Sequence, residues 1–587
     1  MTAQASEASE SPDAAGAAPL DITDLGIRYP GRREPALHRV SVSVAAGEQV
    51  GIAGRTGAGK STLALAAAGF IPRVVRAKVD GRVVIDGQDA ATAAGGALLG
   101  RVGIVFATPA NQLSASKLTV REELAFGLEN LGVARDEMDA RIDATLARLS
   151  IAHLADREPF ALSGGEQQRV AIASIVAMGT GVLVLDEPTA QLDPAGTLSV
   201  ADLLEELARA GSAILCAAHD PSVVGRMDRL LVLEGGRSVA FDVPGGALAT
   251  AQKAGGPPTP TLVRLAVAAG LPPSQAFDEE AIAVGLRTAG TTPAPPTAET
   301  PEETPRWTPA GARAPVRVAF EDLAHRYPTG IEAVRGVSLT IEPGETVAVL
   351  GQNGSGKTTL VKHLNGLLRP ASGRVLIDGK PTDDRSIADL AATVGFVFQN
   401  PDEQLFERSV EKEVAFGPRN LKVPAKEIAA RVTASLDAVG LADQRATNPY
   451  DLDLSRRKLV ALAGILAMDP AVLVLDEPTT GQDAEGVLRV GAVVQAMRAA
   501  GRTVVAITHD MEFAATGFGR IVVMRDGVVV ADGPPDTVFA PGNRELLAST
   551  GLTPPPAARI AARMRLPVVP LDAEGLLAAI AGVSPGR

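Results

Sequence analysis

The sequence predicts an α/β protein made of two homologous halves, each built around a largely parallel core sheet. In each half, short runs of β-branched apolar residues alternate with Ala- and Leu-rich stretches of helical character, which is typical of a parallel sheet covered by helices. Four segments of the first half recur in the second at an offset between 290 and 298 residues. A period of this length indicates tandem domains rather than a short-period solenoid. The recurring pairs are 27–30 with 325–328, 102–106 with 394–398, 123–127 with 413–417, and 182–189 with 472–479.

Composition and charge narrow the class of protein. The length of 587 residues suggests about three or four domains, and the hydrophobic content of 46% is ample for packed cores. A net charge of -12 argues against a protein whose main partner is nucleic acid, because that task needs a basic surface. The single cysteine, Cys216, excludes a disulfide framework and fits a reducing compartment. Its apolar neighbours at 213–218 predict a buried structural thiol.

Neither a membrane-spanning segment nor a leader peptide is predicted. No uncharged apolar run approaches the roughly 18 residues that a transmembrane helix needs. The N-terminal stretch is rich in Ala, Ser and acidic residues and has no basic region of the kind that opens a signal peptide. We therefore expect a cytosolic chain that acts at a membrane only through a partner.

Composition shifts along the chain predict the domain boundaries. The N-terminal stretch is expected to be disordered, and a segment crowded with Pro, Thr, Glu and Gly between the halves reads as a linker that cannot bury enough apolar surface to order itself. Trp307 lies in this linker and is assigned no function. A short tail of helical pattern follows each half, at 261–286 and 557–580. The expected boundaries are a tail at 1–19, domain 1 at 20–245, its extension at 246–286, the linker at 287–315, domain 2 at 316–542 and its extension at 543–587.

Each half contains the phosphate-binding P-loop pattern G-x-x-x-x-G-K-[ST], at 54–61 and 351–358, between a strand-like run and a helical run. Glycines let successive backbone N–H groups curl round an anion, and the helix that follows adds its positive N-terminal end. The lysine can reach the β- and γ-phosphates of ATP, and the Ser or Thr hydroxyl can hold Mg²⁺. A lone match could be a Gly-rich turn with a surface lysine, but two matches argue against that. The predicted nucleotide-binding residues are Gly54, Gly57, Gly59, Lys60, Ser61 and Thr62 in the first half, and Gly351, Asn353, Gly354, Ser355, Gly356, Lys357, Thr358 and Thr359 in the second.

A second recurring pattern delivers paired carboxylates. In each half a run of four apolar residues ends in Asp-Glu, so a buried strand presents two acids at its C-terminal end, where ligands bind in α/β sheets. Asp186 and Asp476 suit the coordination sphere of Mg²⁺ together with Ser61 or Thr358, and Glu187 and Glu477 are placed to polarise an attacking water. Carboxylates that merely cap a loop would explain one copy but explain two copies poorly.

The segment Leu162–Arg169 reads L-S-G-G-E-Q-Q-R, in which Ser163, Gly164 and Gly165 open a helix and present donors to an anion. It matches the signature motif of ATP-binding cassette (ABC) ATPases, and the sequence resembles that family over both halves. The resemblance implies two tandem P-loop ABC nucleotide-binding domains, each with a helical subdomain and a small C-terminal helical extension. It also implies an ATPase that uses ATP and Mg²⁺ and couples hydrolysis to transport across a membrane.

The resemblance further assigns roles to single residues that their local sequence would not reveal. By this resemblance, the switch histidines that contact the γ-phosphate are His219 and His509, and the Q-loop glutamine that senses Mg²⁺ and the membrane partner is Gln399. The aromatic residues that stack on adenine are Tyr29 and Tyr327, and the D-loop aspartates are Asp193 and Asp483. We therefore expect Glu477, His509, Glu187, His219 and Gln399 in catalysis. Among them, Gln399 is also expected at the metal.

The string Phe398–Phe406 is similar to the Q-loop region of energy-coupling factor (ECF) ATPases and related cobalt and nickel importers, and 109–113 keeps a trace of it. The resemblance implies a peripheral subunit at the cytoplasmic face of the membrane, docked on a transmembrane T component that engages a substrate-specific S component. The solute, a vitamin or a transition-metal ion, is then chosen by another chain. A fused ATPase of a sugar or peptide importer is the alternative within the class. A soluble tandem cassette acting on ribosomes or DNA is a further alternative, against which the acidic charge, the linker composition and the single cysteine argue.

Two regions depart from the family pattern, the Q-loop of the first half and the signature of the second. The first half has Ala107 where the second has Gln399, and counting back from the second Asp-Glu pair places Asp453 and Ser455 where the signature has Ser163 and Gly165. A slip of two residues would restore Leu-Ser but still leave two arginines in place of the glycines. Because ABC domains pair head to tail, both departures are expected to fall in the composite site of the first P-loop. We therefore hypothesise one competent site and one that binds ATP but turns over slowly.

Overall fold

The computed structural model describes residues 18–94, 96–162, 164–190, 192–289, 308 and 316–582, without the side chain of Ala110. Most of the expected tail and linker lies outside these residues, as do Trp307 and the signature serine Ser163. The chain divides into two compact units. The first comprises residues up to 192 together with 196–243, and the second comprises 193–195 together with 244 onwards. Within the described residues, no helix is long and apolar enough to cross a membrane.

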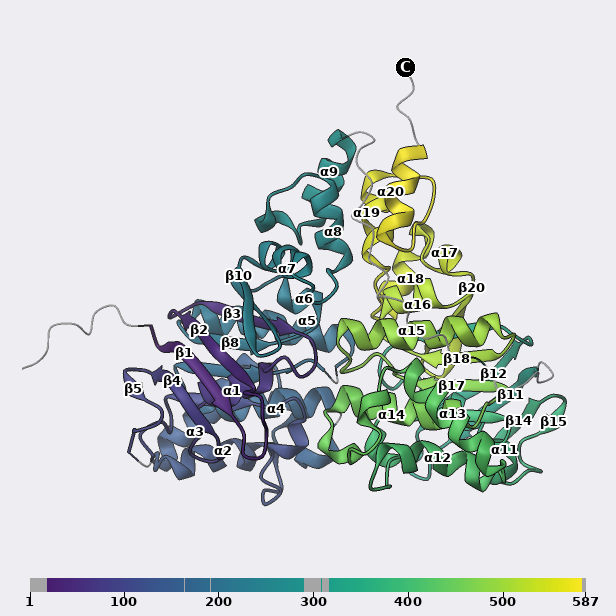
Figure 1. The fold of residues 1–587 in the computed structure, drawn as a ribbon, viewed down its shortest axis with the longest axis horizontal. Helices are drawn as coiled ribbons and strands as arrows, with labels where there is room; N and C mark the ends of the chain where they lie inside the picture. Colours follow the sequence, from purple (N-terminus) through teal and green to yellow (C-terminus); the bar gives the residue numbers. More distant parts are fainter. Residues whose placement is uncertain are drawn as a thin grey trace, which may run out of the picture. The chain divides into compact units, whose positions relative to one another are not determined.

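The first unit is an α/β domain with two sheets (Figure 1). Its strands are β1 (Leu20–Arg28), β2 (Leu37–Val44), β3 (Gln49–Gly54), β4 (Lys78–Ile85), β5 (Gln88–Asp89), β6 (Val102–Val105), β7 (Val182–Asp186), β8 (Ala213–Ala217), β9 (Arg229–Glu234) and β10 (Arg237–Asp242). The core sheet has the order β10-β9-β3-β8-β7-β6 and is parallel except for β10, and an antiparallel sheet has the order β2-β1-β4-β5. As predicted, Cys216 is fully buried on β8, and burial raises the pKa of its thiol.

The helices of the first unit include α1 (Lys60–Ala67), α2 (Val120–Asn130), α3 (Arg135–Arg148), α4 (Gly164–Ala177), α5 (Pro194–Arg209) and α6 (Pro221–Val224). Helix α2 shows why a helix starts where it does. The Thr119 hydroxyl accepts a hydrogen bond from the Glu122 backbone N–H, and the Glu122 carboxylate accepts one from the Thr119 N–H. This reciprocal pairing satisfies two donors that the first turn of a helix leaves unpaired.

The second unit repeats the same plan. Its strands are β11 (Val318–Arg326), β12 (Glu332–Ile341), β13 (Thr346–Leu350), β14 (Ser372–Ile377), β15 (Lys380–Pro381), β16 (Val394–Val397), β17 (Val472–Asp476), β18 (Thr503–Ile507), β19 (Arg520–Arg525) and β20 (Val528–Gly533). Its helices include α10 (Lys357–Lys362), α11 (Ile387–Ala391), α12 (Val410–Asn420), α13 (Ala425–Ala438), α14 (Leu454–Ala467), α15 (Ala484–Ala499), α16 (Met511–Gly517), α17 (Pro535–Val538) and α18 (Arg544–Ser549). Its sheets have the orders β16-β17-β18-β13-β19-β20 and β12-β11-β14-β15, which match the first unit.

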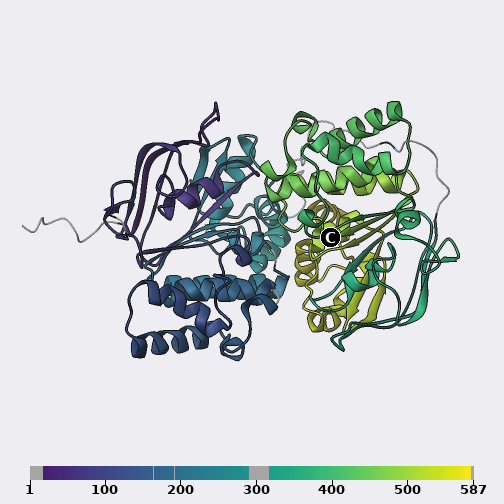
Figure 2. The same ribbon diagram turned by 90° about the horizontal axis from the view of Figure 1, so that it is seen from below.

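Strand β13 shows how alternation builds two layers of core. Its residues Val347 and Val349 pack with the antiparallel sheet, whereas Ala348 and Leu350 pack with the buried faces of α14 and α15. Successive side chains of a strand point to opposite faces, so one apolar strand serves both layers. Helices α12, α13 and α14 form the expected helical subdomain and lie as a green layer beside the strands of their unit in Figure 2.

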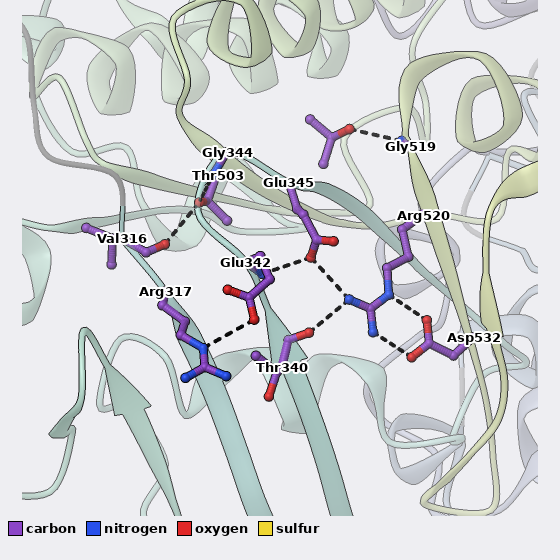
Figure 3. A network of polar contacts seen from close by, with 11 residues as sticks. Val316, Arg317, Thr340, Glu342, Gly344, Glu345, Thr503, Gly519, Arg520 and Asp532 are labelled. Atoms are coloured by element: carbon purple, nitrogen blue, oxygen red, sulfur yellow. Dashed lines mark hydrogen bonds and ion pairs between the residues drawn. The ribbon is translucent and has the colours of Figure 1, made fainter.

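A polar network joins the two sheets of the second unit where β19 begins (Figure 3). The Arg520 guanidinium donates to both oxygens of Asp532 at 2.6 Å, to Glu345 at 3.1 Å and to the Thr340 carbonyl at 2.9 Å. One planar cation therefore ties the ends of β12 and β20 to the start of β13. In the first unit, Arg229 plays the same part with Glu48.

The short tails form helices, as expected, but the tail of the first half belongs to the second unit. It consists of α7 (Pro244–Lys253), α8 (Thr261–Ala268) and α9 (Glu279–Ala289), and α9 thus continues past the expected start of the linker at 287. It packs on α19 (Pro556–Met564) and α20 (Ala573–Gly582), where Glu279 accepts two hydrogen bonds from Arg559 at 2.6 and 2.8 Å. Arg264 of α8 also pairs with Glu574 of α20.

Candidate nucleotide-binding and catalytic sites

The second P-loop joins the end of β13 to the start of α10. Gly351, Gly354 and Gly356 have φ values of 145°, 81° and 97°, which side-chain-bearing residues rarely adopt. A Cβ at Gly356 would lie 2.1 Å from the Ala333 carbonyl oxygen, so close backbone approach also requires glycine there. Lys357 is buried and its Nζ donates to the carbonyls of Gly351 and Gln352, both at 2.7 Å, while burial lowers its pKa to about 8. The loop therefore has the cradle and the lysine that its sequence predicts.

The first P-loop has the same geometry between β3 and α1. Gly54, Gly57 and Gly59 have φ values of 145°, 82° and 104°. The Lys60 ammonium donates to the Gly54 carbonyl at 2.9 Å and to the Arg55 carbonyl at 3.3 Å. Both loops are thus built for a phosphate chain, and the local backbone geometry gives no sign of the asymmetry that the sequence suggests elsewhere.

The predicted metal-binding pairs are assembled in both halves. The Thr358 hydroxyl donates to Asp476 at 3.3 Å, and the Ser61 hydroxyl donates to Asp186 at 3.1 Å. Burial raises the pKa of both aspartates, that of Asp476 to about 6, with the neighbouring glutamate charge acting in the same direction. A hydroxyl beside a carboxylate supplies the oxygen ligands that Mg²⁺ prefers, so these residues fit that ion. The buried hydroxyl of Ser355, which has no hydrogen-bond partner within the described residues, also fits a ligand in the loop.

The glutamates that follow the predicted metal-binding aspartates share an unusual backbone conformation. Glu187 and Glu477 have φ values of 55° and 52°, in the left-handed region. Residues other than glycine adopt this conformation at an energetic cost, and such residues are concentrated at functional sites. Glu477 Oε1 lies 2.6 Å from His509 Nε2, and Thr480 donates to its other oxygen at 2.8 Å. Although burial acts to raise the pKa of Glu477, the His509 and Thr480 hydrogen bonds leave it lowered, so the carboxylate stays ionised.

The first half assembles the same acid and histidine less tightly. Glu187 Oε1 lies 2.9 Å from His219 Nε2 and 3.9 Å from Lys60 Nζ.

The predicted adenine-stacking aromatics also contact the helices that follow their P-loops. The hydroxyls of Tyr29 and Thr62 lie 3.2 Å apart, and those of Tyr327 and Thr359 lie 3.0 Å apart. In each half, the structure therefore brings the P-loop lysine, the Asp-Glu pair, the histidine and the tyrosine together round the P-loop.

Gln399 and the signature residues stand apart from these clusters. Gln399 is exposed just beyond β16 and makes no hydrogen bond to the other candidate residues within the described part of the chain. Ala107 occupies the equivalent position with only a methyl group. Gly164 and Gly165 open α4, and a Cβ at Gly164 would meet open space, which leaves the backbone approachable.

The bounds of α4 and α14 bear on how the second half aligns with the predicted signature motif. Helix α4 spans 164–177 and α14 spans 454–467, so both ends keep the offset of 290 that the Asp-Glu pairs have. This supports counting back from those pairs and disfavours a two-residue slip. Asp453 then holds the signature-serine position, where its carboxylate caps α14 by accepting from the Arg456 N–H at 2.9 Å.

Sequence reasoning missed a glutamine that connects two elements of each helical subdomain. Gln404 accepts a hydrogen bond from the Phe398 N–H at 3.3 Å and donates to the Ala461 carbonyl on α14 at 3.5 Å. Gln112 makes the same pair of contacts in the first half, to Phe106 at 3.2 Å and Ala171 at 3.1 Å. The recurrence of Gln-Leu in both halves was the available signal. Part of the ECF-like string therefore serves to fasten the Q-loop to the signature helix.

A buried histidine pair is peculiar to the second half. His363 Nδ1 donates to the Thr359 carbonyl at 2.7 Å, and its Nε2 lies 3.2 Å from His325 Nδ1, which also lies 3.1 Å from the Arg369 carbonyl. The His325 ring also packs edge-on against Tyr327, with 4.8 Å between ring centroids. Ile27 and Ala66 hold these positions in the first half. The pair thus links the predicted adenine-stacking tyrosine to the P-loop helix in one half only.

This pair should make the stability of the second half depend on pH. Burial lowers the pKa of His363 below its ordinary value of 6.5, so the unfolded chain binds this proton more readily than the folded chain. The stabilisation is present above pH 6.5 and is lost as the pH falls from there through the folded-state pKa. In calorimetry between pH 7.5 and 5.5, the wild type should lose thermal stability more steeply than His325→Ile/His363→Ala, which carries the first-half residues. Equal slopes would contradict this prediction.

Known proteins resemble this chain in sequence and show the family to which it belongs. The ABC transporter family matches residues 37–190 and 334–480. A protein of Methanosarcina acetivorans assigned as an ABC transporter ATP-binding protein is 39% identical over 93% of this chain and 90% of its own length. One from Caldanaerobacter subterraneus is 33% identical over 92% of this chain and 96% of its own length. Among solved structures, CbiO1 of Clostridium perfringens, described as part of the ABC transporter complex CbiONQ, is 36% identical over 43% of this chain and 100% of its own, with a TM-score of 0.37.

Both P-loops, both Asp-Glu pairs and both sheets follow one plan, and the family match falls on the two halves separately. The chain belongs to the ABC transporter family, as an ATP-binding subunit that carries two ATP-hydrolysing domains in tandem.

Proposed function

We propose that this chain is the energy-coupling ATPase of an ECF-type importer for a micronutrient, either a vitamin or a transition-metal ion. The observation that carries the proposal is the ECF-like string Phe398–Phe406 and the way the fold displays it. Gln404 fastens the string to α14, while Phe406 at its end is 56% exposed and packs edge-on against Phe416, with 4.6 Å between ring centroids. Tyr450, also exposed, donates to the Leu405 carbonyl at 2.6 Å.

These three side chains, Phe406, Phe416 and Tyr450, form an aromatic surface on the helical subdomain of the second half. Exposed aromatics held in place by backbone hydrogen bonds are suited to a partner, because they bury a large area at low entropic cost. We assign this surface to a helix of the transmembrane T component, which in turn engages the S component. The chain would then act at the cytoplasmic face of the membrane without entering it.

The competent site is assigned to the second P-loop. Glu477 orients and polarises the attacking water, and His509 holds that carboxylate and reaches towards the γ-phosphate. Lys357 offsets charge on the β- and γ-phosphates. Thr358 and Asp476, with Gln399, would hold Mg²⁺, which neutralises charge that develops on the transferred phosphoryl group. In the proposed head-to-tail pairing, the intact signature of Ser163, Gly164 and Gly165 completes this site.

The other site, with Lys60, Ala107, Glu187 and His219, is proposed to bind ATP and turn over slowly. Its Mg²⁺ would be held by Ser61 and Asp186, and its signature is the degenerate one. Asp453 places a carboxylate where the signature serine would meet the γ-phosphate, and like charges repel. Arg456 lies 3.7 Å from Asp453 and offsets part of that charge, which favours slow turnover over complete loss.

Co-purification from native membranes tests the transport role. Tagged chain should bring down one T-like membrane protein and one or more small S-like proteins, identified by mass spectrometry. Phe406→Ala/Phe416→Ala should lose most of the T-like protein, whereas Ile387→Ala, which truncates an equally exposed apolar side chain on α11, should keep it. Both variants should still bind ATP.

Other outcomes would redirect the proposal. A pair of ordinary permeases with a soluble binding protein would indicate the ATPase of a sugar or peptide importer. Ribosomes or DNA, without a membrane protein, would overturn the transport role. Retention of the T-like protein by the double aromatic variant would contradict the docking surface while leaving the ECF assignment in place.

A further inference from the structure

A buried lysine on the degenerate signature helix reaches the catalytic turn of its own domain. Lys458 lies on α14 with only 6% of its surface exposed. Its Nζ donates to the Glu477 carbonyl at 3.0 Å and to the Thr480 carbonyl at 2.8 Å. An ammonium group has three donors, and two of them are committed to peptide groups of the turn that follows β17.

A second contact joins the same helix to the far end of that turn. Ser455, which precedes Lys458 by three residues on α14, donates from its hydroxyl to Gln482 Oε1 at 2.5 Å, and Gln482 Nε2 donates back to the Ser455 carbonyl at 3.2 Å. Both side chains are 5% exposed. We define the catalytic turn as residues 477–483. Helix α14 is therefore attached to both the beginning and the end of this turn.

The first half lacks this arrangement at all three positions. Gln168 stands for the lysine, and its Nε2 has no hydrogen-bond partner within the described residues. Gly165 and Leu192 stand for Ser455 and Gln482, and a Cβ at that glycine would lie 3.5 Å from the leucine side chain. The three polar residues of the second half, Ser455, Lys458 and Gln482, are thus complementary, because each contacts either the turn or another of the three.

The conformation that these contacts hold is a costly one. Glu477 has its φ at 52° and Glu187, which lacks these contacts within the described residues, at 55°, so in the second half the contacts add a restraint to a strained turn that both halves share. Burial lowers the pKa of Lys458 to about 8, while the nearby Glu477 and Asp476 charges act to raise it, so the ammonium form is present at neutral pH. A charge-assisted hydrogen bond to the Glu477 carbonyl in a buried site is among the stronger restraints available.

We propose that Lys458, together with the Ser455–Gln482 pair, is a positioning device for Glu477: the degenerate signature helix has become a brace for the catalytic turn of its own domain. This inference rests on the proposed catalytic role of Glu477. The proposal gives the altered signature helix a structural role: the substitutions proposed to weaken one ATP site also hold the catalytic glutamate of the other site in place.

Steady-state ATPase kinetics on the full chain test the brace. Lys458→Gln, which carries the first-half residue, should lower kcat by about tenfold and change KM by less than about twofold, because a misplaced catalytic group loses turnover rather than ground-state binding. Gln482→Leu, which carries the first-half residue and lies outside the signature, removes the contact to Ser455 and should show the same split independently. Fluorescent ATP should bind both variants with unchanged affinity.

A matched control separates positioning from general packing. Arg431 of α13 donates to the Ala467 and Met468 carbonyls at the other end of α14, at 3.4 and 3.5 Å, and Arg431→Met should keep kcat. Glu477→Gln is measured alongside. If Glu477→Gln lowers turnover while both brace variants keep full kcat, the brace is wrong and the proposed function stands. If Glu477→Gln itself keeps full turnover, the role of Glu477 is wrong and the brace falls with it.

Discussion

Glu477→Gln is expected to lower ATP turnover by about 100-fold or more, since positioned general bases contribute factors of roughly 10² to 10⁴. The amide keeps the shape of the side chain but cannot polarise water as a carboxylate does. Glu187→Gln is expected to lower turnover by less than about threefold, because in the proposed head-to-tail pairing its site would be completed by the degenerate signature and would carry little of the flux. The measurement is steady-state ATP hydrolysis by the full chain.

This comparison is internally controlled because the two glutamates are structural equivalents. Both follow the aspartate that ends a core strand, both have left-handed backbones and both contact the predicted switch histidine, at 2.6 Å in the second half and 2.9 Å in the first. Any difference between the variants therefore comes from what completes each site. Equal losses from the two substitutions would refute the asymmetry, and binding of labelled ATP at two sites in each variant would exclude a folding defect.

Arg502→Ser is expected to destabilise the second half by about 3 to 5 kcal/mol. Arg502 and Asp469 form an ion pair at 3.0 Å with side chains only 3% and 5% exposed, next to the start of β17. Removing the cation takes the guanidinium away from a buried carboxylate, and the loss of one member of a buried ion pair is strongly destabilising. In calorimetry, the transition of the second unit should fall by roughly 2 to 4 °C per kcal/mol.

The first half supplies the control for this pair. It has Gly179 and Ser212 at the two positions, so the double variant Asp469→Gly/Arg502→Ser reproduces an arrangement that the same fold tolerates. Asp469 has φ at 56°, a conformation that glycine adopts freely, and the double variant should lie within about 1 kcal/mol of the wild type. A double variant as unstable as Arg502→Ser alone would show that the pair is not the source of the effect.

Much of each candidate site could be predicted because its residues lie in short, continuous patterns. The P-loop glycines, Lys357 and the Asp-Glu pair each have a local reason for their spacing, and the fold delivers them together because parallel strands end at one edge of a sheet. The switch histidines needed the family resemblance, since a lone histidine after a strand carries no local signal. Gln404 was missed because its two partners, Phe398 and Ala461, are distant from each other in sequence.

The sequence by itself determined the duplication, the α/β class of each half and the two P-loops, and it predicted the loss of the second signature, because all of these are patterns along the chain. Only the tertiary structure decided that α8 and α9 pack on α19 and α20, that Lys458 reaches the Glu477 carbonyl, and that the Ser455 hydroxyl donates to Gln482. Those contacts join residues through space. Their energies come from burial and from donors that find acceptors on another element, which no periodicity in the sequence records.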